Sequence, residues 1–256
     1  MSFLPGMGHG HSRKSRSIST AVASQNGGLR LYVLKMAQRI SAIEPQQKNS
    51  KRVNIYLDGK FAFGLTAVVA AWLRVGQDLG EDKIAGLKEQ DEREITYQKA
   101  LHFLSYRPRS SEEVRQNLLK RGISESLSVE TLNRLQSTGL VNDEDFARAW
   151  VENRNTFRPL GKPALRMELQ RKGLSDEIVK TVLDTQVDEA DLALTTARKY
   201  ARRLEDLEWP AFRQKLSGFL ARRGFSYTTL APVVSEVWKE TQTADTGSIS
   251  ENEEYP

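Results

Sequence analysis

The sequence contains VRQNLLKRGIS at Val114–Ser124, and similar stretches recur as LRMELQRKGLS at Leu165–Ser175 and LSGFLARRGFS at Leu216–Ser226. The glycines of these three stretches stand 51 residues apart. Each copy ends in two basic residues, a glycine, an apolar residue and a serine. A fixed period of this size is typical of tandem copies of one supersecondary unit. The repeats therefore decide the fold.

The residues around each glycine predict three helices in each repeat. In the first repeat a helix over 94–106 is followed by Ser110, which is expected to cap the middle helix. Glu113 stands at the third helical position, so the two residues predict a capping box. Gly122 is expected to end that helix in the left-handed conformation that glycine adopts at low cost. The third helix, over about 127–137, closes the repeat.

The second and third repeats follow the same plan. Asn142 is expected to cap a helix over 143–157, and a middle helix then runs from Gly161 to Gly173. The third repeat is predicted to open with a long helix over 189–207 and to close with one over 226–239. The expected bounds of the three repeats are about 94–142, 143–188 and 189–240.

Each middle helix carries an apolar pair at positions i and i+4. One short amphipathic helix cannot bury such a pair alone, so neighbouring helices must cover it. The fold class is therefore expected to be mainly α, with three tandem three-helix repeats in an elongated curved array where each unit touches mainly its neighbours. The pairs are Val114/Leu118, Leu165/Leu169 and Leu216/Leu220.

A small β unit with short helices is predicted over 36–93, before the repeats. Three β-prone runs occur there, and Asp58-Gly59 between the second and third is a strong signal for a hairpin with a type I′ turn. Residues 1–35 are expected to form a disordered basic arm, and 241–256 a disordered acidic tail. Met36 is an alternative start, and the sequence leaves the choice between Met1 and Met36 open. The β-prone runs are Arg39–Ile43, Arg52–Leu57 and Lys60–Leu65.

Composition narrows the class of protein. The 256-residue chain is 39% hydrophobic and 28% charged, which suits a helical protein with a large solvated surface. It has no cysteine, which excludes disulfides, thiolate metal sites and cysteine nucleophiles. No apolar run is long enough for a membrane helix, and the N-terminus lacks the apolar stretch of a secretory signal. A cytoplasmic protein is expected.

The net charge of +5 is unevenly distributed. Residues 1–52 carry +8, 53–94 carry −3, 95–239 carry +5 and 240–256 carry −5. A basic body with a basic arm suits a polyanionic partner such as DNA or a nucleoprotein. Ordinary solvated helix faces would give the same charges in the repeats, and both interpretations stay open here.

The sequence shows no enzyme motif. A phosphate-binding loop, a zinc-binding H-E-x-x-H helix and a G-x-S-x-G elbow are all absent. The three histidines, His9, His11 and His102, do not form a catalytic or metal-binding pattern. The acidic run 143–145 is explained as the first turn of a helix, where the helix dipole favours acids. We therefore expect no catalytic residues, metal or cofactor.

The candidate functional residues are the cations of the repeats. The doublets Lys120/Arg121, Arg171/Lys172 and Arg222/Arg223 recur at equivalent places, so a regular array would present them periodically on one surface. Stabilisation of helix C-termini, worth about 0.3–1 kcal/mol per cation, explains one cation per helix better than a doublet in all three. The candidate binding face comprises Arg107, Arg109, Arg115, Lys120, Arg121, Arg154, Arg158, Lys162, Arg166, Arg171, Lys172, Arg222 and Arg223.

Several stretches resemble the RecX family of recombinase regulators. They are Ala100–Val114 followed by Leu118–Gly122, then Gly139–Ala147, and Arg158–Gly161. The resemblance spans about residues 95–240, and the combination is specific although each piece alone would be weak. The β unit looks like an extension carried by some members of the family.

The resemblance implies three tandem three-helix repeats and a cytoplasmic modulator of the RecA recombinase. Such a protein binds along the groove of the RecA–DNA filament and restrains ATP hydrolysis, strand exchange and co-protease activity, as in DNA repair, recombination and the SOS response. The alternative is a general basic DNA-binding or architectural module that acts without a recombinase, through nonspecific phosphate contacts. The sequence leaves open whether modulation is inhibitory or stimulatory. A monomer is the simplest expectation.

Overall fold

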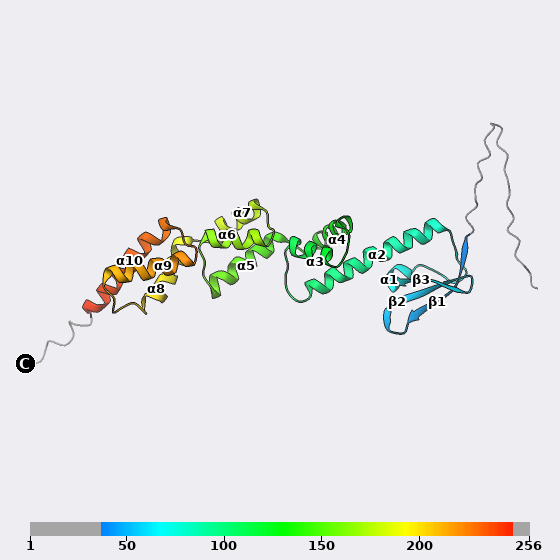
Figure 1. Ribbon diagram of the computed structural model, residues 1–256, viewed down its shortest axis with the longest axis horizontal. Helices are drawn as coiled ribbons and strands as arrows, with labels where there is room; N and C mark the ends of the chain where they lie inside the picture. Colours follow the sequence, from blue (N-terminus) through cyan, green and yellow to red (C-terminus); the bar gives the residue numbers. More distant parts are fainter. Residues whose placement is uncertain (1–36, 248–256) are drawn as a thin grey trace, which may run out of the picture. The chain divides into compact units, whose positions relative to one another are not determined.

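The computed structural model describes residues 37–247, with side chains up to residue 243. The chain divides into two compact units, one ending at Asp91 and the other starting at Glu92. Helix α2, Glu81–Leu104, continues from the first unit into the second (Figure 1). The predicted basic arm and the end of the predicted acidic tail, residues 248–256, lie outside the described residues.

The first unit contains a four-stranded antiparallel sheet in the order β3-β2-β1-β4. The hairpin from β2 to β3 turns at Asp58 and Gly59, whose φ angles of 49° and 81° confirm the predicted type I′ turn. Three strands were expected. The fourth is only two residues long and pairs with the start of β1, so no alternating pattern marks it. The strands are β1 Gln38–Gln46, β2 Asn49–Leu57, β3 Lys60–Thr66 and β4 Asp78–Leu79.

The short helix α1, Ala67–Ala70, and the first turns of α2 contribute to the core of this unit. The core forms around Ile40 and Ile55, which are fully buried. The buried carboxylate of Asp91 accepts the backbone N–H of Thr66 and forms an ion pair with Arg52 at 3.0 Å. These contacts fix α2 against the sheet.

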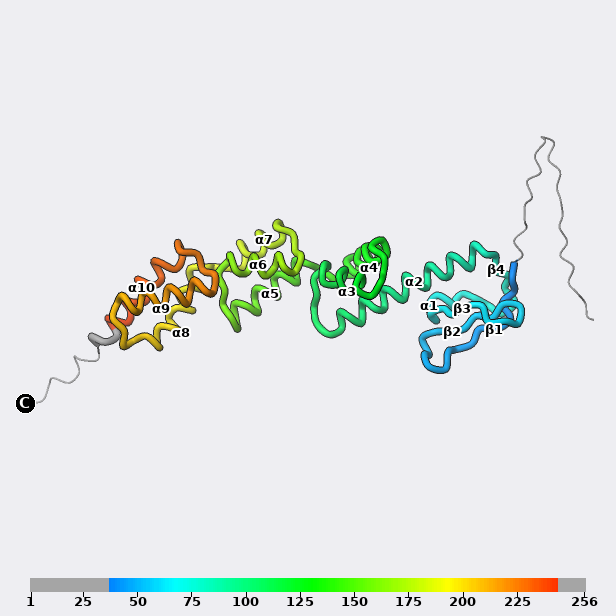
Figure 2. The backbone as a smooth tube through the Cα atoms, in the orientation of Figure 1, coloured from blue at the N-terminus to red at the C-terminus, as the bar shows by residue number. Residues whose placement is uncertain are grey.

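Within residues 92–247, the described part of the second unit, nine consecutive helical segments form three groups, counting the C-terminal part of α2 as the first (Figure 2). The first repeat is completed by α3 Ser111–Lys120 and α4 Glu125–Ser137. The second contains α5 Asp143–Phe157, α6 Lys162–Arg171 and α7 Asp176–Gln186. The third contains α8 Glu189–Ala201, α9 Trp209–Arg222 and α10 Tyr227–Gly247.

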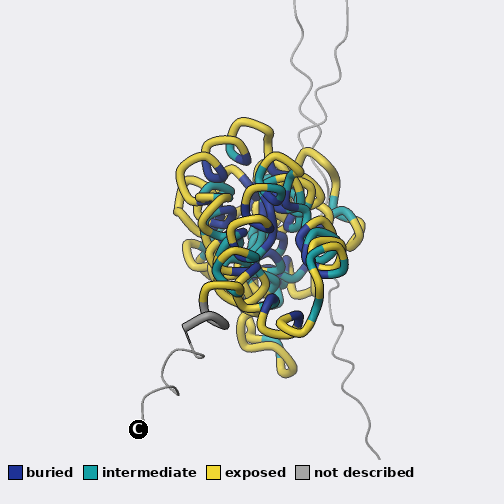
Figure 3. Tube along the Cα trace, turned by 90° about the vertical axis from the view of Figure 1, so that its left-hand side faces the viewer, coloured by how far each residue is buried: buried dark blue, intermediate teal, exposed yellow. Residues whose placement is uncertain are grey.

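Each repeat has its own apolar core, and the middle helices α3, α6 and α9 supply its centre. All six residues of the three apolar pairs have 0% exposure, as predicted. Buried and exposed positions are interspersed along the helices of the repeats, and Figure 3 shows dark blue and yellow segments following one another along the tube. The mainly helical fold with three tandem repeats is therefore confirmed, while the curvature of the array stays a prediction.

The helix ends follow the predicted capping in most places. Ser110, Asn142 and Ser175 each accept a backbone N–H of the helix that they precede. Gly122, Gly173 and Gly224 take φ angles of 77°, 79° and 76°, which are the left-handed values expected after a helix. A glycine therefore follows the C-terminal end of each middle helix, whereas a side-chain cap at the N-terminal end is present in α3 but not in α6 or α9.

Three helix boundaries differ from prediction. Helix α2 begins at residue 81 and runs without interruption to 104, where the first helix of the repeats was expected to begin at 94, because no proline or other break separates the two segments. Helix α8 ends at Ala201 instead of 207, since tight turns after it return Leu204 to the core, where its exposure is 5%. Helix α10 continues to Gly247, into the segment predicted to be a disordered tail. An ion pair at 2.6 Å between Arg198 on α8 and Glu240 holds α10 near this extension.

Candidate partner-binding surface

The three middle helices meet end to end. The C-terminal end of α6 contacts the N-terminal end of α3, and the C-terminal end of α9 contacts the N-terminal end of α6. We call these contacts the first junction and the second junction. The dipoles of the helices favour this arrangement, because a negative C-terminus faces a positive N-terminus.

The first junction is held by charged groups. The hydroxyl of Ser110 donates to the carbonyl of Lys172 at 2.6 Å. The carboxylate of Glu113 lies between two cations, at 2.8 Å from Nζ of Lys172 and 2.9 Å from Nη2 of Arg107. Ser110 accepts the N–H of Glu113, as the capping box predicts, but the carboxylate binds these cations instead of returning to the cap. The second half of the predicted capping box is therefore wrong.

The environment of Glu113 sets its charge. Partial burial pushes its pKa upward, but the hydrogen bonds from Arg107 and Lys172 outweigh burial and lower the pKa to about 2. Lys172 also lies over the ring of Trp150, 4.9 Å from its centre. The first junction is therefore a fixed ionic network at neutral pH.

The second junction uses backbone groups. The N–H of Gly161 donates to the carbonyl of Arg223 at 3.0 Å, and the guanidinium of Arg223 donates to the carbonyl of Pro159 at 3.0 Å. A Cβ atom at Gly161 would collide with the carbonyl of Gly224. Glycine is thus required at this position by close approach of two backbones.

The two members of each basic doublet have different roles. The inner members Lys172 and Arg223 are the C-cap residues of α6 and α9 and take part in the junctions. The outer members Lys120, Arg171 and Arg222 are exposed and form no ion pair with any residue that the structure describes. Only the outer members are free to bind a partner in all three repeats.

Helix α3 ends differently from the other two middle helices. The side chain of its C-cap residue, Arg121, donates to Asn117 on the same helix, at 3.1 Å, and forms no ion pair with any residue that the structure describes. The space that a Cβ on Gly122 would enter is open, with no neighbour within 4 Å, whereas neighbours crowd the equivalent Gly173 and Gly224. The first repeat therefore ends the stack of middle helices.

Most of the other predicted cations are engaged within the protein. Arg115 forms ion pairs with Glu112 and Glu125, both at 2.8 Å. Arg109 lies over the ring of Phe103 at 4.2 Å from its centre. Arg154 and Lys162 also form ion pairs, with Glu168 at 2.7 Å and Asp184 at 3.6 Å, whereas Arg158 and Arg166 are exposed and have no ion pair among the described residues.

A hollow of about 260 Å³ brings two of the doublets together beside the first junction. Lys120, Arg171 and Lys172 all line it, although they come from two repeats. The aromatic ring of Phe103 and the carboxylates of the junction complete the wall. The lining residues are Phe103, Glu112, Glu113, Gln116, Asn117, Lys120, Arg171 and Lys172.

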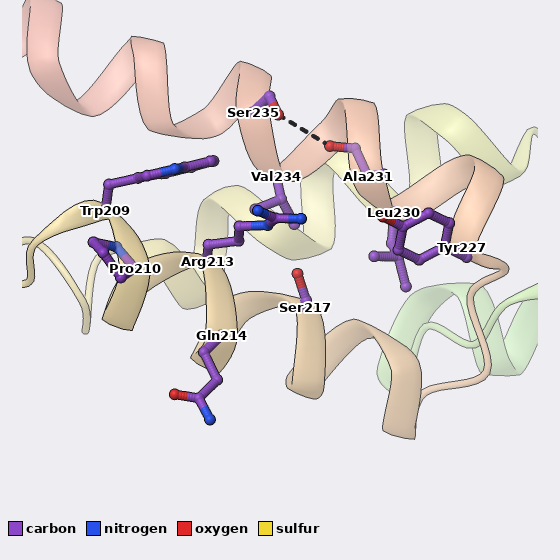
Figure 4. A pocket seen from close by; sticks show the side chains of 10 residues that line it. All are labelled: Trp209, Pro210, Arg213, Gln214, Ser217, Tyr227, Leu230, Ala231, Val234 and Ser235. Carbon is purple, nitrogen blue, oxygen red and sulfur yellow. Dashed lines mark hydrogen bonds between the residues drawn. The ribbon is translucent and has the colours of Figure 1, made fainter.

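A second hollow, of about 740 Å³, lies in the third repeat between α9 and α10 (Figure 4). Arg213 and Ser217 face it from α9, and Tyr227, Leu230 and Val234 face it from α10. It has one cation and no carboxylate in its wall, and none of the doublet residues lines it. The doublets therefore do not extend into this hollow.

Two exposed aromatic residues were missed from the sequence. Tyr106 is 69% exposed and Phe157 is 79% exposed, and each is followed by an arginine and a proline. They lie 51 residues apart, so the same period that revealed the doublets could have revealed them. Their equivalent places in two repeats add them to the candidate partner-binding surface.

The described residues contain no group of three or more acidic or histidine side chains that could hold a metal ion. Within residues 37–247, no helix has the length and apolar character needed to cross a membrane.

Comparisons with known proteins agree with this geometry. Family models of RecX match four parts of the chain. Regulatory protein RecX of Bacillus licheniformis is 33% identical over 201 residues, which cover 77% of this chain and 76% of that protein. The chain belongs to the RecX family. The RecX models are those for the N-terminal domain at 38–80 and for the first, second and third three-helix domains at 97–135, 142–183 and 187–229.

Other RecX proteins show the same relationship. Regulatory protein RecX of Bacillus subtilis is 31% identical over 202 residues, which cover 77% of this chain and 76% of that protein. A crystal structure of regulatory protein RecX superimposes with a TM-score of 0.65 at 28% identity, covering 77% of this chain and 98% of that one. The RecX of Lactobacillus salivarius gives a TM-score of 0.54 at 27% identity, over 58% of this chain and 97% of its own. The β unit, expected to be an extension of some members, has its own RecX family model.

Proposed function

We propose that this chain modulates the RecA recombinase, as an inhibitor, by binding along the groove of the RecA–DNA filament. In this proposal it acts in the cytoplasm as a monomer and restrains ATP hydrolysis, strand exchange and co-protease activity without catalysing a reaction itself. The regulatory family to which the chain belongs supports this role.

The observation that carries the proposal is the recurrence of exposed cations along the repeats. Lys120, Arg171 and Arg222 occupy the same place in three consecutive repeats and have no ion pair among the described residues. A partner that repeats along an axis, such as a protein filament on DNA, can meet each of them in the same way. Exposed positive charges on a protein surface attract a negatively charged nucleoprotein and help to orient it before binding.

The first test is ATP hydrolysis by the cognate RecA on single-stranded DNA, titrated with this protein well below the RecA concentration. Suppression at substoichiometric amounts is expected, because each bound molecule would affect more than one recombinase protomer. No effect on hydrolysis, together with salt-sensitive binding to bare DNA, would favour the general DNA-binding module instead.

The outer cations can be tested separately from the fold. The triple variant Lys120→Glu, Arg171→Glu and Arg222→Glu is expected to weaken filament binding at least about tenfold. Reversal of whole doublets is a poorer test, since Lys172→Glu would place a second carboxylate beside Glu113.

Lys199→Glu is the matched control for the triple variant. Lys199 is exposed, lies on α8 outside the doublets and has no ion pair among the described residues. This variant is expected to bind the filament as the wild type does. Unchanged binding by the triple variant would disprove the role of the outer cations.

A further inference from the structure

The two junctions place equivalent residues in contrasting surroundings. Arg107 and Lys172 of the first junction correspond, 51 residues later, to Arg158 and Arg223 of the second. The carboxylate residue Glu113 corresponds to Ala164. The cations are thus retained at the second junction, but the anion between them is missing.

The first junction shows what these positions bind. Arg107 contacts both oxygens of Glu113, at 2.9 Å and 3.1 Å, and Lys172 contacts one of them at 2.8 Å. A guanidinium that grips a carboxylate through two bonds is among the stronger polar contacts in proteins. The repeat architecture therefore contains a carboxylate site that the chain itself occupies.

The second junction leaves the same site open. Arg158 is exposed and, like Arg223, forms no ion pair with any residue that the structure describes. Arg223 donates to the carbonyl of Pro159 and lies over the ring of Phe219, 4.8 Å from its centre, so its position is fixed. Burial lowers the pKa of Arg223, and the charge of Arg158 lowers it further, so the two cations lie close enough to repel each other.

The acidic residues around the second junction are already engaged. Glu168 accepts hydrogen bonds from Arg154 and from the indole of Trp150. Glu189 accepts the backbone N–H of Lys162 at 3.1 Å and the hydroxyl of Thr229 at 3.3 Å. Partial burial raises the pKa of Glu168, but the hydrogen bonds from Arg154 and Trp150 and the charges of Arg154 and Arg158 lower it overall, so Arg158 lies near this carboxylate without an ion pair to it. Neither Glu168 nor Glu189 forms an ion pair with Arg158 or Arg223, which leaves both cations available to an external anion.

We propose that Arg158 and Arg223 bind a carboxylate side chain of the protein partner, at the place that Ala164 leaves empty. Two observations favour a carboxylate of a protein over a phosphate of DNA. The occupied copy of the site holds a carboxylate, and the exposed ring of Phe157 beside Arg158 offers an apolar contact of the kind that protein interfaces use. This inference rests on the proposed function, since the partner is taken to be the RecA filament.

The test is binding of the full-length Arg158→Gln variant to RecA filaments on single-stranded DNA, with Arg107→Gln as the matched control. Arg158→Gln is expected to weaken filament binding by about 10- to 100-fold, as for loss of one charged bidentate contact, with no loss of thermal stability. Arg107 was predicted to lie on the binding face, but the structure engages its guanidinium with Glu113, so Arg107→Gln is expected to bind the filament as the wild type does and to melt at a lower temperature. Equal binding by Arg158→Gln and the wild type would overturn the inference.

Binding to bare single-stranded DNA distinguishes the source of the anion. Arg158→Gln is expected to bind bare DNA as the wild type does. An equal loss on bare DNA and on the filament would show that the ligand is a phosphate, and it would overturn the assignment to a carboxylate. If the wild type itself fails to bind the filament, the proposed function is wrong and this inference is wrong with it.

Ala164→Glu tests the same site from the opposite direction, because it supplies the missing carboxylate from the chain itself. It is expected to weaken filament binding about as much as Arg158→Gln. Since Gly224 packs on Ala164, the comparison uses protein whose helical content equals that of the wild type. Wild-type binding by such a folded variant would contradict the inference. If Ala164→Glu does not fold, Arg158→Gln alone tests the site, because Arg158 is exposed and its replacement should not disturb the fold.

Discussion

The first and second junctions join the same structural elements by different chemistry. In the first, the carboxylate of Glu113 binds Arg107 and Lys172, and the backbone contact is made through the hydroxyl of Ser110. In the second, the N–H of Gly161 binds the carbonyl of Arg223 directly. A glycine in place of the serine lets the two helix ends approach more closely, and an alanine in place of the glutamate removes the ionic link.

The junctions separate cations that serve the fold from cations that remain exposed. A cation at the C-cap of a middle helix stabilises a junction wherever the C-terminal end of that helix contacts another repeat. Lys172 and Arg223 are the two examples. The outer member of each doublet has no such role and stays exposed. The recurrence of two basic residues therefore combines one residue that serves the fold with one that is free for a partner.

The largest expected effect is at the close approach in the second junction. Gly161→Ala would insert a Cβ against the carbonyl of Gly224, and the backbones would have to separate. Loss of about 3 kcal/mol in the free energy of unfolding is expected, measured by chemical denaturation followed by circular dichroism. The φ of Gly161 is −68°, so the loss would come from the collision and not from backbone strain.

Gly122→Ala is the control for this variant. Gly122 ends α3 with a φ of 77°, and a Cβ there would meet nothing within 4 Å. Only strain of the left-handed backbone, about 1–2 kcal/mol, is therefore expected. Equal losses for the two variants would show that the second junction contributes nothing to stability.

A smaller effect, and one that depends on pH, is expected at the first junction. Glu113→Gln removes the negative charge between Arg107 and Lys172 and should cost about 1–3 kcal/mol near neutral pH. Because the pKa of Glu113 falls from 4.5 to about 2 on folding, its stabilising effect is complete above pH 4.5. As the pH falls from 4.5 towards 2 the unfolded state takes up a proton at Glu113 while the folded carboxylate stays ionised, so the stabilising effect declines and is lost once the folded carboxylate is also protonated.

The measurement is the free energy of unfolding of the wild type and of Glu113→Gln across that pH range. The two curves are expected to run parallel above about pH 5 and to converge below pH 4.5. A constant separation down to pH 2 would mean that the charge of Glu113 does not contribute. The second junction has Ala164 at the equivalent position and should add no such dependence.

Sequence alone was sufficient for the elements that depend on local chemistry. The glycine period, the caps and the i, i+4 apolar pairs describe what happens within one repeat, and the structure confirms them at Gly122, Ser110 and Leu118. The junctions could not be predicted, because they join residues some 60 positions apart, such as Ser110 and Lys172. For the same reason Glu113 was assigned to a local capping box, while a distant lysine and a nearby arginine bind its carboxylate.

The smallest effect compares two serine caps of the first repeat. Ser110 and Ser124 both accept a backbone N–H at the start of a helix, which is worth about 1 kcal/mol when the residue is replaced by alanine. Ser110 is fully buried and also donates to the carbonyl of Lys172, whereas Ser124 is exposed and forms no hydrogen bond with another repeat among the described residues. Ser110→Ala should therefore cost about 1 kcal/mol more than Ser124→Ala, because it leaves a carbonyl of the junction without its hydrogen bond. The difference in unfolding free energy between the two variants measures how much the hydroxyl of Ser110 contributes to the first junction. Because Lys172→Ala keeps the backbone carbonyl of residue 172, the same difference is expected when both variants also carry Lys172→Ala.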